Sequence, residues 1–448
     1  MSEADVQSGR LSPEEISRNF SEMHPPLTRP EALVEADRCY FCYDAPCTTA
    51  CPTEIDIPSF IQKIRSGNIK GSARTILKAN IMGGMCARVC PTEILCEQAC
   101  VRNLHEHQPV RIGLLQRFAT DPVFDHDLAL FERAETTGKR IAVVGGGPAG
   151  LSCAHGLAMR GHDVVVFNRD SKLGGLNEYG IAAYKTVNDF AQREVNWILD
   201  IGGIEVRKNQ ALGVDITLAE LREQFDAVFL GFGLGGVNRL DLSNEDADGV
   251  WDAVDYISRL RQSQTKHDLP VGRRVVVIGG GMTAIDIAVQ SKLLGSEIVD
   301  IVYRRGPEHM GASRYEQDHA QKAGVTIRHW ATPVKLLVGD SVAGVEFART
   351  ELDENGKLRT TGDTWSLDAD IVFKAVGQAI VSEVFGDAAD QLDQRGGKLV
   401  VDDDRRTSLE NVWAGGDCIH GHDDLTVTAV QDGKVAAVAI DRYLASGE

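Results

Sequence analysis

Two stretches of the chain share one pattern, an apolar run that leads into a glycine-rich turn. Residues 140–144 (RIAVV) precede residues 145–150 (GGGPAG), and residues 274–278 (RVVVI) precede residues 279–284 (GGGMTA). Short apolar runs that are bounded by glycine and followed by helix-forming residues predict a strand, a turn and a helix of a parallel sheet. Because strand and helix patterns alternate from residue 138 onward, we expect α/β architecture there.

The residues before this region follow the pattern of short amphipathic helices. Ile57, Ile61 and Ile64 recur at helical spacing, and a glycine and an asparagine at residues 67–68 interrupt the pattern before a second helix. A Ser-Pro pair at residues 12–13 is typical of a helix start with serine as the N-cap. We therefore expect an α-helical N-terminal region.

Composition and charge narrow the class of protein. The chain is 43% hydrophobic and 25% charged, which is ordinary for a globular enzyme. Its formal net charge of −18 argues against nucleic-acid binding, which needs a basic surface. Apolar runs such as residues 371–373 are far too short to span a membrane, and the segment MSEADVQSGRLSPEE has no apolar targeting core. We therefore expect a cytoplasmic protein that binds neither nucleic acid nor membrane.

Eight of the ten cysteines lie between residues 39 and 100, in two groups of four with short internal spacings. The groups are Cys39, Cys42, Cys47 and Cys51, and Cys86, Cys90, Cys96 and Cys100. Such spacings let several thiolates converge, and they predict paired iron–sulfur clusters. In bacterial ferredoxins the cysteine before proline ligates the other cluster. By that rule Cys39, Cys42 and Cys47 would hold one cluster, and Cys51 would cross to the second.

Zinc sites and disulfides are the two alternative uses of these cysteines. Zinc ribbons need two cysteine pairs at tetrahedral spacing, and the continuation of the first group fits a cubane cluster better. A disulfide framework needs an oxidising compartment, which the polar N-terminal segment does not indicate. Iron–sulfur clusters are the better interpretation, with zinc as the alternative.

The two glycine-rich turns carry a dinucleotide-binding fingerprint, because each stands between a strand and a helix. The first glycine allows the tight turn, the second lets the backbone approach a pyrophosphate, and the third position allows close helix packing. Glycine at the third position indicates a flavin site in the first motif, and alanine indicates a nicotinamide site in the second. The alternative is a pair of structural turns that bind nothing. The candidate binding residues are Gly145, Gly147, Ala149, Gly150, Gly279, Gly281, Met282, Thr283 and Ala284.

Each fingerprint is expected to be followed by a residue that binds the adenosine ribose. After the first, residues 164–168 (VVVFN) end in Asn168 where an acidic residue is usual. An amide can still accept one hydroxyl hydrogen bond, without charge assistance. After the second, a strand ends in Arg304 and Arg305. Arginines there favour the 2′-phosphate of NADPH, and the alternative is that both side chains are merely solvated.

A further candidate segment lies near residue 415. Residues 414–418 (AGGDC) and a later helical pattern predict a strand, a turn and a helix. Asp417, after Gly416, could bind a ribityl hydroxyl. The helix start at Thr426 and Thr428 would face the flavin pyrimidine and stabilise negative charge on the reduced ring.

These patterns together predict an α-helical iron–sulfur domain followed by tandem Rossmann-like FAD and NAD(P) domains. A chain of 448 residues is too long for one hydrophobic core. We expect a helical domain with two 4Fe-4S clusters over residues 1–136, an FAD-binding domain from residues 137–235 and 376–448, and an NAD(P)H-binding domain over residues 236–375.

Four segments resemble one protein family, and the resemblance extends over nearly the whole chain. They are residues 39–47 (CYFCYDAPC), 51–61 (CPTEIDIPSFI), 83–90 (GGMCARVC) and 174–181 (GGLNEYGI). The chain resembles the flavin and iron–sulfur subunit (PreT-type) of bacterial NAD-dependent dihydropyrimidine dehydrogenase and the N-terminal half of the mammalian enzyme. It is more distantly similar to the small subunit of glutamate synthase, in which the stretch before the second cysteine group differs.

The resemblance implies a ligand set that the spacings alone do not give. One cluster would take Cys39, Cys42, Cys47 and Cys100, and the other would take Cys51, Cys90, Cys96 and Gln116. Cys86 would be spare, although a count of cysteines alone would choose it, and it remains the alternative ligand. The cofactor-binding candidates also include Gly175 and Leu176 from the fourth segment.

The resemblance further implies FAD, two 4Fe-4S clusters and NAD(P)H as cofactors. The chain would be the electron-input subunit of dihydropyrimidine dehydrogenase, which takes hydride from NAD(P)H onto FAD and passes electrons through its clusters. The partner subunit, in a heterotetramer, would hold FMN, further clusters and the site where uracil or thymine is reversibly reduced. Because hydride transfer demands no side-chain acid or base, no catalytic residue is expected.

The sequence leaves two alternative functions. The same module could serve another acceptor, as in glutamate synthase, against which Gln116 argues. A non-catalytic flavin and iron–sulfur scaffold is the other alternative, but such a protein would not need a second nucleotide site.

Overall fold

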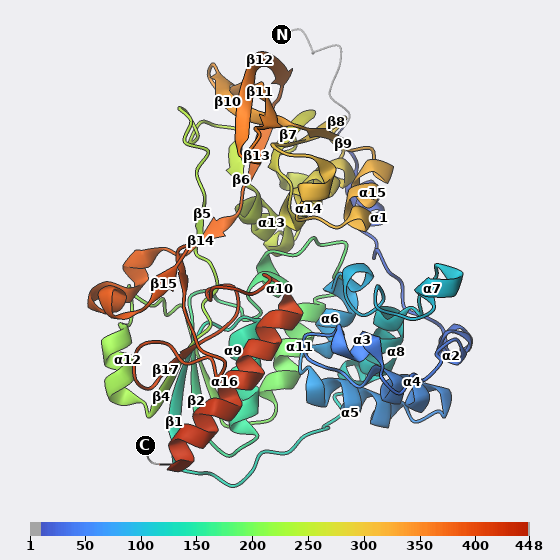
Figure 1. The fold of residues 1–448 in the computed structure, drawn as a ribbon, viewed down its shortest axis with the longest axis vertical. Helices are drawn as coiled ribbons and strands as arrows, with labels where there is room; N and C mark the ends of the chain where they lie inside the picture. The colour runs from blue at the N-terminus through green and yellow to red at the C-terminus, as the bar shows by residue number, and fades with distance from the viewer. Residues whose placement is uncertain (1–9, 447–448) are drawn as a thin grey trace. The chain divides into compact units, whose positions relative to one another are not determined.

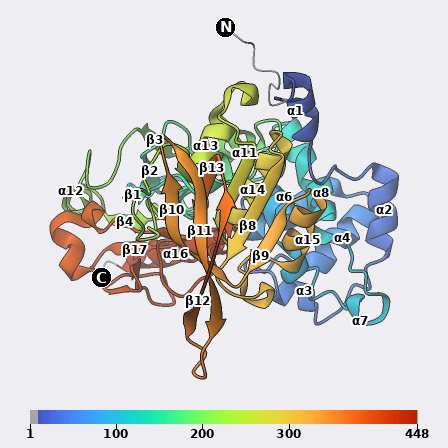
Figure 2. The same ribbon diagram turned by 90° about the horizontal axis from the view of Figure 1, so that it is seen from above.

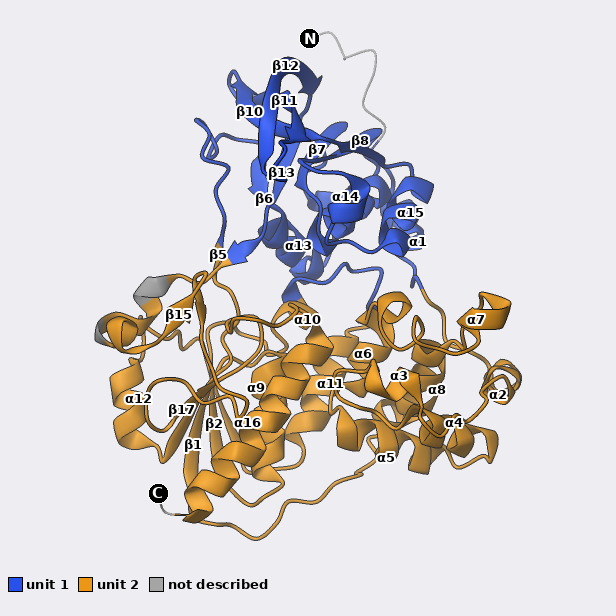
Figure 3. Cartoon of the chain, viewed as in Figure 1, with its two compact units in different colours: residues 1–23, 179–187, 237–378 blue, residues 24–178, 188–236, 379–448 orange. Residues whose placement is uncertain are grey.

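The computed structural model describes residues 10–446, so the polar residues 1–9 lie outside the described part. The chain folds into two compact units (Figure 3). Unit 1 contains the residues up to Met23, Tyr179–Val187 and Val237–Gln378. Unit 2 contains His24–Glu178, Asn188–Gly236 and the residues from Ala379 onward. The boundaries of the three expected domains stay a prediction.

The first part of unit 2 is α-helical (Figure 1). Its helices are α2 (Arg29–Asp37), α3 (Pro46–Thr49), α4 (Ile57–Arg65), α5 (Ile69–Ala79), α6 (Gly83–Val89), α7 (Asn103–Glu106) and α8 (Ile112–Asp125). Helix α4 buries Ile57, Ile61 and Ile64, as their spacing predicts. The predicted interruption is confirmed, because Gly67 has a φ of 78° and the Asn68 side chain caps the start of α5.

The second part of unit 2 is a five-stranded parallel sheet in the order β17-β4-β1-β2-β3. The strands are β1 (Arg140–Val144), β2 (Asp163–Asn168), β3 (Ile204–Lys208), β4 (Ala227–Leu230) and β17 (Val412–Ala414). The helices are α9 (Pro148–Ala158), α10 (Leu176–Tyr179), α11 (Phe190–Leu199), α12 (Leu218–Gln224) and α16 (Thr426–Ser446). Helices α9 and α16 lie side by side (Figure 1). The turn after β1, the central strand, stands at the carboxyl edge where such sheets bind nucleotides.

Unit 1 is built on a second five-stranded parallel sheet, in the order β6-β13-β7-β8-β9. The strands are β6 (Val250–Asp252), β7 (Arg274–Gly279), β8 (Ile298–Tyr303), β9 (Thr326–His329) and β13 (Ile371–Ala375). The helices are α1 (Pro13–Asn19), α13 (Ala253–Gln262), α14 (Met282–Leu293) and α15 (Arg314–Lys322). The predicted start of α1 is confirmed, because the Ser12 side chain accepts a hydrogen bond from the backbone N–H of Glu15 at 3.2 Å.

Unit 1 also contains an antiparallel sheet that the alternating sequence pattern did not predict. It consists of β10 (Ala331–Val338), β11 (Val342–Leu352) and β12 (Leu358–Asp368), in that order. The hairpin of β11 and β12 extends beyond β10 (Figure 2). Its inner face buries Leu336, Val345 and Phe347 in one apolar cluster with residues of the parallel sheet.

The remaining elements are short. The strand β5 (Gly236–Val237) pairs with β14 (Gln378–Ala379), and β15 (Gln394–Arg395) pairs with β16 (Lys398–Leu399). The 3-10 helices are η1 (Thr92–Ile94), η2 (Lys266–Asp268), η3 (Pro307–His309) and η4 (Ser382–Gln391). Within residues 10–446, no helix has the length and apolarity that crossing a membrane requires.

Candidate cofactor sites

The three glycines of the first fingerprint have different surroundings. A Cβ on Gly145, whose φ is 99°, would collide with the carbonyl of Gly231, and one on Gly150 would collide with the carbonyl of Gly145. These two glycines are therefore required by packing. A Cβ on Gly147 would meet only the Cα of Gly175, at 3.7 Å. The backbone at Gly147, which precedes α9, thus faces the open space that an approaching pyrophosphate needs.

Segments far apart in the sequence converge on the start of α9. Gly175 has a φ of 54°, and its Cβ position lies 2.9 Å from the Cα of Gly147. Gly416 has a φ of 79°, and its Cβ position lies 3.0 Å from the Cβ of Ala149. The structure therefore brings together the candidate flavin residues of three sequence motifs. Their arrangement fits a nucleotide that lies across the sheet edge.

The N-terminus of α16 is tied to the segment that carries Leu176. The Thr426 hydroxyl donates to Oδ1 of Asn177 at 2.7 Å. Leu176 itself is 40% exposed, and Thr428 follows in the first turn of α16. Asn177 is fully buried and was not among the candidate residues. Its place inside the GGLNEYG motif was the signal that could have identified it.

Asn168, the expected ribose ligand, has other partners in the structure. Its Oδ1 accepts a hydrogen bond from the backbone N–H of Gly146 at 2.9 Å. Its Nδ2 donates to the carbonyls of Asp170 and Lys172 at 2.8 and 2.9 Å. The amide therefore holds the fingerprint turn to the loop after β2, and a ribose contact by Asn168 stays a prediction.

Asp417 lies in a turn next to a second buried carboxyl group, that of Asp432. Burial, with Asp424 nearby, raises the pKa of its carboxyl to about 6. The neighbouring Gly416 donates its N–H to Oδ2 of the fully buried Asp432 at 2.9 Å. Asp432 also pairs with Arg405 at 2.9 Å. Sequence reasoning missed Asp432, because nothing in its local pattern distinguishes it from a surface residue of α16.

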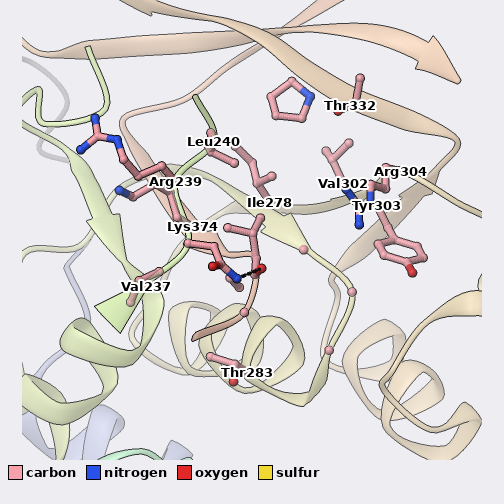
Figure 4. A pocket seen from close by; sticks show the side chains of 18 of the residues that line it. Val237, Arg239, Leu240, Ile278, Thr283, Val302, Tyr303, Arg304, Thr332 and Lys374 are labelled. Atoms are coloured by element: carbon pink, nitrogen blue, oxygen red, sulfur yellow. Dashed lines mark hydrogen bonds between the residues drawn. The ribbon is translucent and has the colours of Figure 1, made fainter. Parts of the chain in front are cut away.

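The second fingerprint borders a cavity of about 810 Å³ within unit 1 (Figure 4). Gly279 and Gly280 are confined, because Cβ atoms there would collide with the carbonyl of Ala375 and the ring of Tyr303. A Cβ on Gly281 would meet nothing within 4 Å. The cavity is lined by Gly279, Gly281, Thr283 and Arg304 among others, while Met282 begins α14 and Ala284 is fully buried. The open position, Gly281, is the second glycine of the fingerprint, as Gly147 is in the first motif, and a pyrophosphate site requires an open backbone there.

The two arginines after β8 differ in environment. Arg304 is exposed and lines the cavity (Figure 4). Arg305 is partly buried, and its Nε has no hydrogen-bond partner among the described residues. A buried guanidinium nitrogen without a partner is costly, and an anionic group would satisfy it. Arg304 therefore fits a phosphate in the cavity, whereas Arg305 is not among the residues that line it, and a role of the pair at the 2′-phosphate stays a prediction.

A buried lysine also lines this cavity. Lys374 is 8% exposed and forms ion pairs with Glu245 at 3.5 Å and Asp252 at 3.1 Å. Glu245 accepts backbone hydrogen bonds from Leu240 and Leu242, so the ion pair fixes the loop on one side of the cavity to β13. No motif in the sequence indicated Lys374 as a lining residue.

Four of the cysteines surround one small pocket within the helical part of unit 2. Cys39, Cys42, Cys47 and Cys100 all line it. Burial, followed by the nearby Cys39 and Cys100, raises the pKa of the Cys47 thiol to about 12. Crowded buried thiols resist ionisation without a metal, and ligation to iron would offset that cost. The residues fit the first predicted cluster.

The other cysteines form a second group. A hydrogen bond with Cys86, then burial, then Cys51 and Cys96, raise the pKa of the Cys90 thiol well above its ordinary value. Nε2 of Gln116 donates to the carbonyl of Gly83 at 2.7 Å, which leaves its amide oxygen as the atom that could ligate iron. Both Cys86 and Gln116 therefore remain candidates for the fourth ligand.

The spacing of the side chains bears on the zinc alternative. Among residues 10–446, no group of three or more His, Cys, Asp or Glu side chains is placed to hold a single metal ion. A tetrahedral zinc site needs its ligands to converge on one atom. A 4Fe-4S cubane instead spreads its ligands over four iron atoms.

Two protein families cover most of the chain. Residues 16–128 match the family described as dihydropyrimidine dehydrogenase domain II, 4Fe-4S cluster. Residues 139–433 match the family of pyridine nucleotide-disulphide oxidoreductases. Among solved structures, Mycobacterium tuberculosis FprA in complex with NADPH has a TM-score of 0.58 at 20% identity, over 69% of this chain and 85% of that one. Thioredoxin reductase of T. acidophilum has a TM-score of 0.54 at 21% identity, over 69% of this chain and 100% of that one, so both show the shared fold.

Two curated relatives extend over nearly the whole chain. The NAD-dependent dihydropyrimidine dehydrogenase subunit PreT of Salmonella typhimurium is 34% identical over 425 residues, with 95% of this chain and 97% of the relative covered. The glutamate synthase [NADPH] small chain of Escherichia coli is 34% identical over 446 residues, with 95% and 94% covered. These matches confirm the predicted fold class and iron–sulfur domain. The chain therefore belongs to the pyridine nucleotide-disulphide oxidoreductases, as a flavin and iron–sulfur oxidoreductase of the group that contains PreT and the glutamate synthase small chain.

Proposed function

We propose that this chain is the electron-input subunit of a dihydropyrimidine dehydrogenase. The observation that carries the proposal is that unit 2 contains both the open flavin fingerprint and the two cysteine groups. An oxidoreductase with this arrangement can pass electrons from a flavin to clusters inside one compact unit. A bound flavin would accept two electrons with one hydride and release them singly, as iron–sulfur clusters require.

The cavity of unit 1 would bind the nicotinamide cofactor. Its backbone at Gly281 is open to a pyrophosphate, and Arg304, which lines the cavity, would with the adjacent Arg305 provide cations for a 2′-phosphate. These features favour NADPH as the donor. Residues 279–284 would hold the pyrophosphate at the start of α14, while Lys374 keeps the neighbouring loop in place.

The two cysteine groups differ in burial, and this difference suggests the order in which electrons pass through their clusters. Cys51 is buried, whereas Cys39 and Cys42 are each followed by an exposed tyrosine, Tyr40 at 53% and Tyr43 at 106% exposure. We infer that electrons leave through the cluster held by Cys39, Cys42, Cys47 and Cys100. An acceptor would dock on the helical part of unit 2, near residues 39–118.

The acceptor in this proposal is a partner subunit that holds FMN, further clusters and the pyrimidine site. Each uracil or thymine reduced there would consume two electrons and two protons. The chain alone should oxidise NADPH with an artificial dye but show no turnover of uracil. Turnover should appear on mixing with the FMN-bearing partner, and uracil reduction by the lone chain would contradict the proposal.

The identity to the glutamate synthase small chain, which equals that to PreT, supports a second candidate function. In that case the acceptor would be the large subunit of a glutamate synthase. The two candidates are separated by measuring NADPH-dependent glutamate formation with such a subunit beside uracil reduction with the FMN-bearing one. Activity in only one of the two mixtures assigns the acceptor.

A further inference from the structure

Three consecutive residues of α16 together contact the helical part and the α/β part of unit 2. Asp432 holds the Gly416 turn of the candidate flavin site through the 2.9 Å hydrogen bond. A Cβ on Gly433 would collide with the carbonyl of Ala149, so α16 packs directly on the fingerprint helix α9. Lys434 extends to the helical part, where its Nζ donates to two backbone carbonyls. The flavin side and the cysteine side of unit 2 are thus joined through one turn of helix.

The two carbonyls that Lys434 binds lie in the turn after Cys51 and at the end of α5. One is the carbonyl of Thr53, at 3.1 Å, and the other is the carbonyl of Ala79, at 3.0 Å. Thr53 is buried, and its Oγ1 lies 3.4 Å from Sγ of Cys51. Ala79 is the last residue of α5 and leads into α6. The ammonium therefore stands between the Cys51 segment and the end of α5, which precedes α6 and Cys90.

Burial lowers the pKa of Lys434, whereas the Glu54 carboxylate and the Cys51 thiol, when ionised, favour its charged form. Its side chain is partly buried, and partial burial reduces the screening of its charge by water. A fixed positive charge favours the more negative of two redox states. A reduced cluster carries one more negative charge than the oxidised cluster.

We propose that Lys434 is a positioning residue that fixes a positive charge beside the cluster ligated by Cys51 and raises the reduction potential of that cluster. The inference rests on the proposed function, because it requires a cluster at Cys51, Cys90 and Cys96. Lys434 lies eight residues after Thr426, which is about 12 Å along the helix that begins at the candidate flavin site. The cluster that Lys434 biases is therefore the one next to the flavin side, where a higher potential favours entry of the first electron.

The test is an anaerobic redox titration followed by electron paramagnetic resonance, with the full chain and its native cofactors. In Lys434→Gln, which removes the charge, the midpoint potential of one cluster should fall, while that of the other cluster, the FAD content and NADPH-dependent dye reduction stay unchanged. Lys434→Arg, which keeps the positive charge, should have the wild-type potential. The matched control is Lys78→Gln, an exposed lysine one residue from Ala79, which should shift neither cluster.

A second variant should shift the reduction potential in the opposite direction. Glu54→Gln removes a negative group that faces Lys434 and should raise the potential of the same cluster. If Lys434→Gln loses iron, its cluster potential cannot be measured. The inference is then tested by the potential of the same cluster in Glu54→Gln, which should rise, and in Lys434→Arg, which should equal that of the wild type. An unchanged potential in Glu54→Gln, an unchanged potential in an iron-replete Lys434→Gln, or an equal shift in Lys78→Gln would overturn the inference. A wild-type chain that binds no iron would instead overturn the proposed function, so the two failures are distinguishable.

Discussion

The carboxyl group of Glu194 on α11 accepts a hydrogen bond from the backbone N–H of Gly84 on α6 at 2.9 Å, although the two residues are 110 positions apart in the sequence. The same Oε1 accepts a second hydrogen bond from the N–H of Met85 at 3.0 Å. Glu194 is fully buried, and its Oε2 has no hydrogen-bond partner among the described residues. Burial raises the pKa of Glu194 to about 8. A neutral carboxylic acid thus links the helical part of unit 2 to its α/β part.

Glu194 predicts a pH dependence of stability. The folded chain holds its proton more tightly than the unfolded chain, whose carboxyl has the ordinary pKa of 4.5. The stability that Glu194 contributes is therefore fully present below pH 4.5 and is lost as the pH rises through about 8. Glu194→Gln, which stays neutral and can still accept both backbone hydrogen bonds, should flatten the fall in thermal stability over that range. Thermal unfolding at several pH values checks this.

The control for this prediction is Glu205→Gln, which changes an exposed carboxylate on β3 of the same unit. It should leave the wild-type pH profile in place. A Glu194→Gln variant that loses stability with rising pH as steeply as the wild type would show that another group controls the profile.

Gly281→Ala should separate nicotinamide binding from folding. The new methyl group would meet no atom of the protein within 4 Å, so the unit should fold normally. It would project where the pyrophosphate is expected, and the KM for NADPH should rise at least about tenfold, or ~1.4 kcal/mol. Gly339→Ala, which also adds a methyl group in open space but far from the fingerprint in sequence, is the matched control. Unchanged NADPH kinetics in Gly281→Ala would exclude the fingerprint as the binding site.

Arg304 and Arg305 should govern the choice of coenzyme. Replacing both with alanine removes the two guanidinium groups after β8, and the KM for NADPH should rise by roughly tenfold or more while that for NADH changes little. Arg359→Ala on the exposed strand β12 should change neither. Equal losses with both coenzymes would assign the arginines to the pyrophosphate or to the fold.

Local patterns predicted the parts of the fold that local physics determines. The strands β1 and β7 enter glycine turns because tight turns and close helix packing require glycine there. Helices α4 and α5 follow from the period of their apolar residues and the break at residues 67–68. The antiparallel sheet β10 to β12 interrupts the expected alternation of strands and helices, and no sequence pattern before or after it predicted this interruption.

The residues that connect distant segments could not be predicted in this way. Lys434 binds carbonyls of Thr53 and Ala79, which are 381 and 355 positions away, and a single helix residue carries no pattern that reveals such a partner. Asn168 was expected at the ribose because it ends β2, and that contact stays a prediction. The sequence carried no sign of the hydrogen bonds that its side chain makes to Gly146 and to the loop after β2. Asp432 and Glu194 were missed for the same reason, since buried carboxylates on amphipathic helices resemble surface residues in sequence.

The fourth ligand of the second cluster is decided by iron content. Cys47→Ser should lose about four of about eight iron atoms, because Cys47 belongs to the first cluster alone. Cys86→Ser should keep the wild-type content, since its thiol lies beside Cys90 as a spare neighbour. Gln116→Ala should lose the second cluster and with it electron transfer to the partner, while much of the dye activity, which needs only the flavin, remains. If Cys86→Ser strips a cluster and Gln116→Ala does not, the hydrogen bond between Cys86 and Cys90 marks a ligand pair, and Gln116 serves only to hold the Gly83 carbonyl.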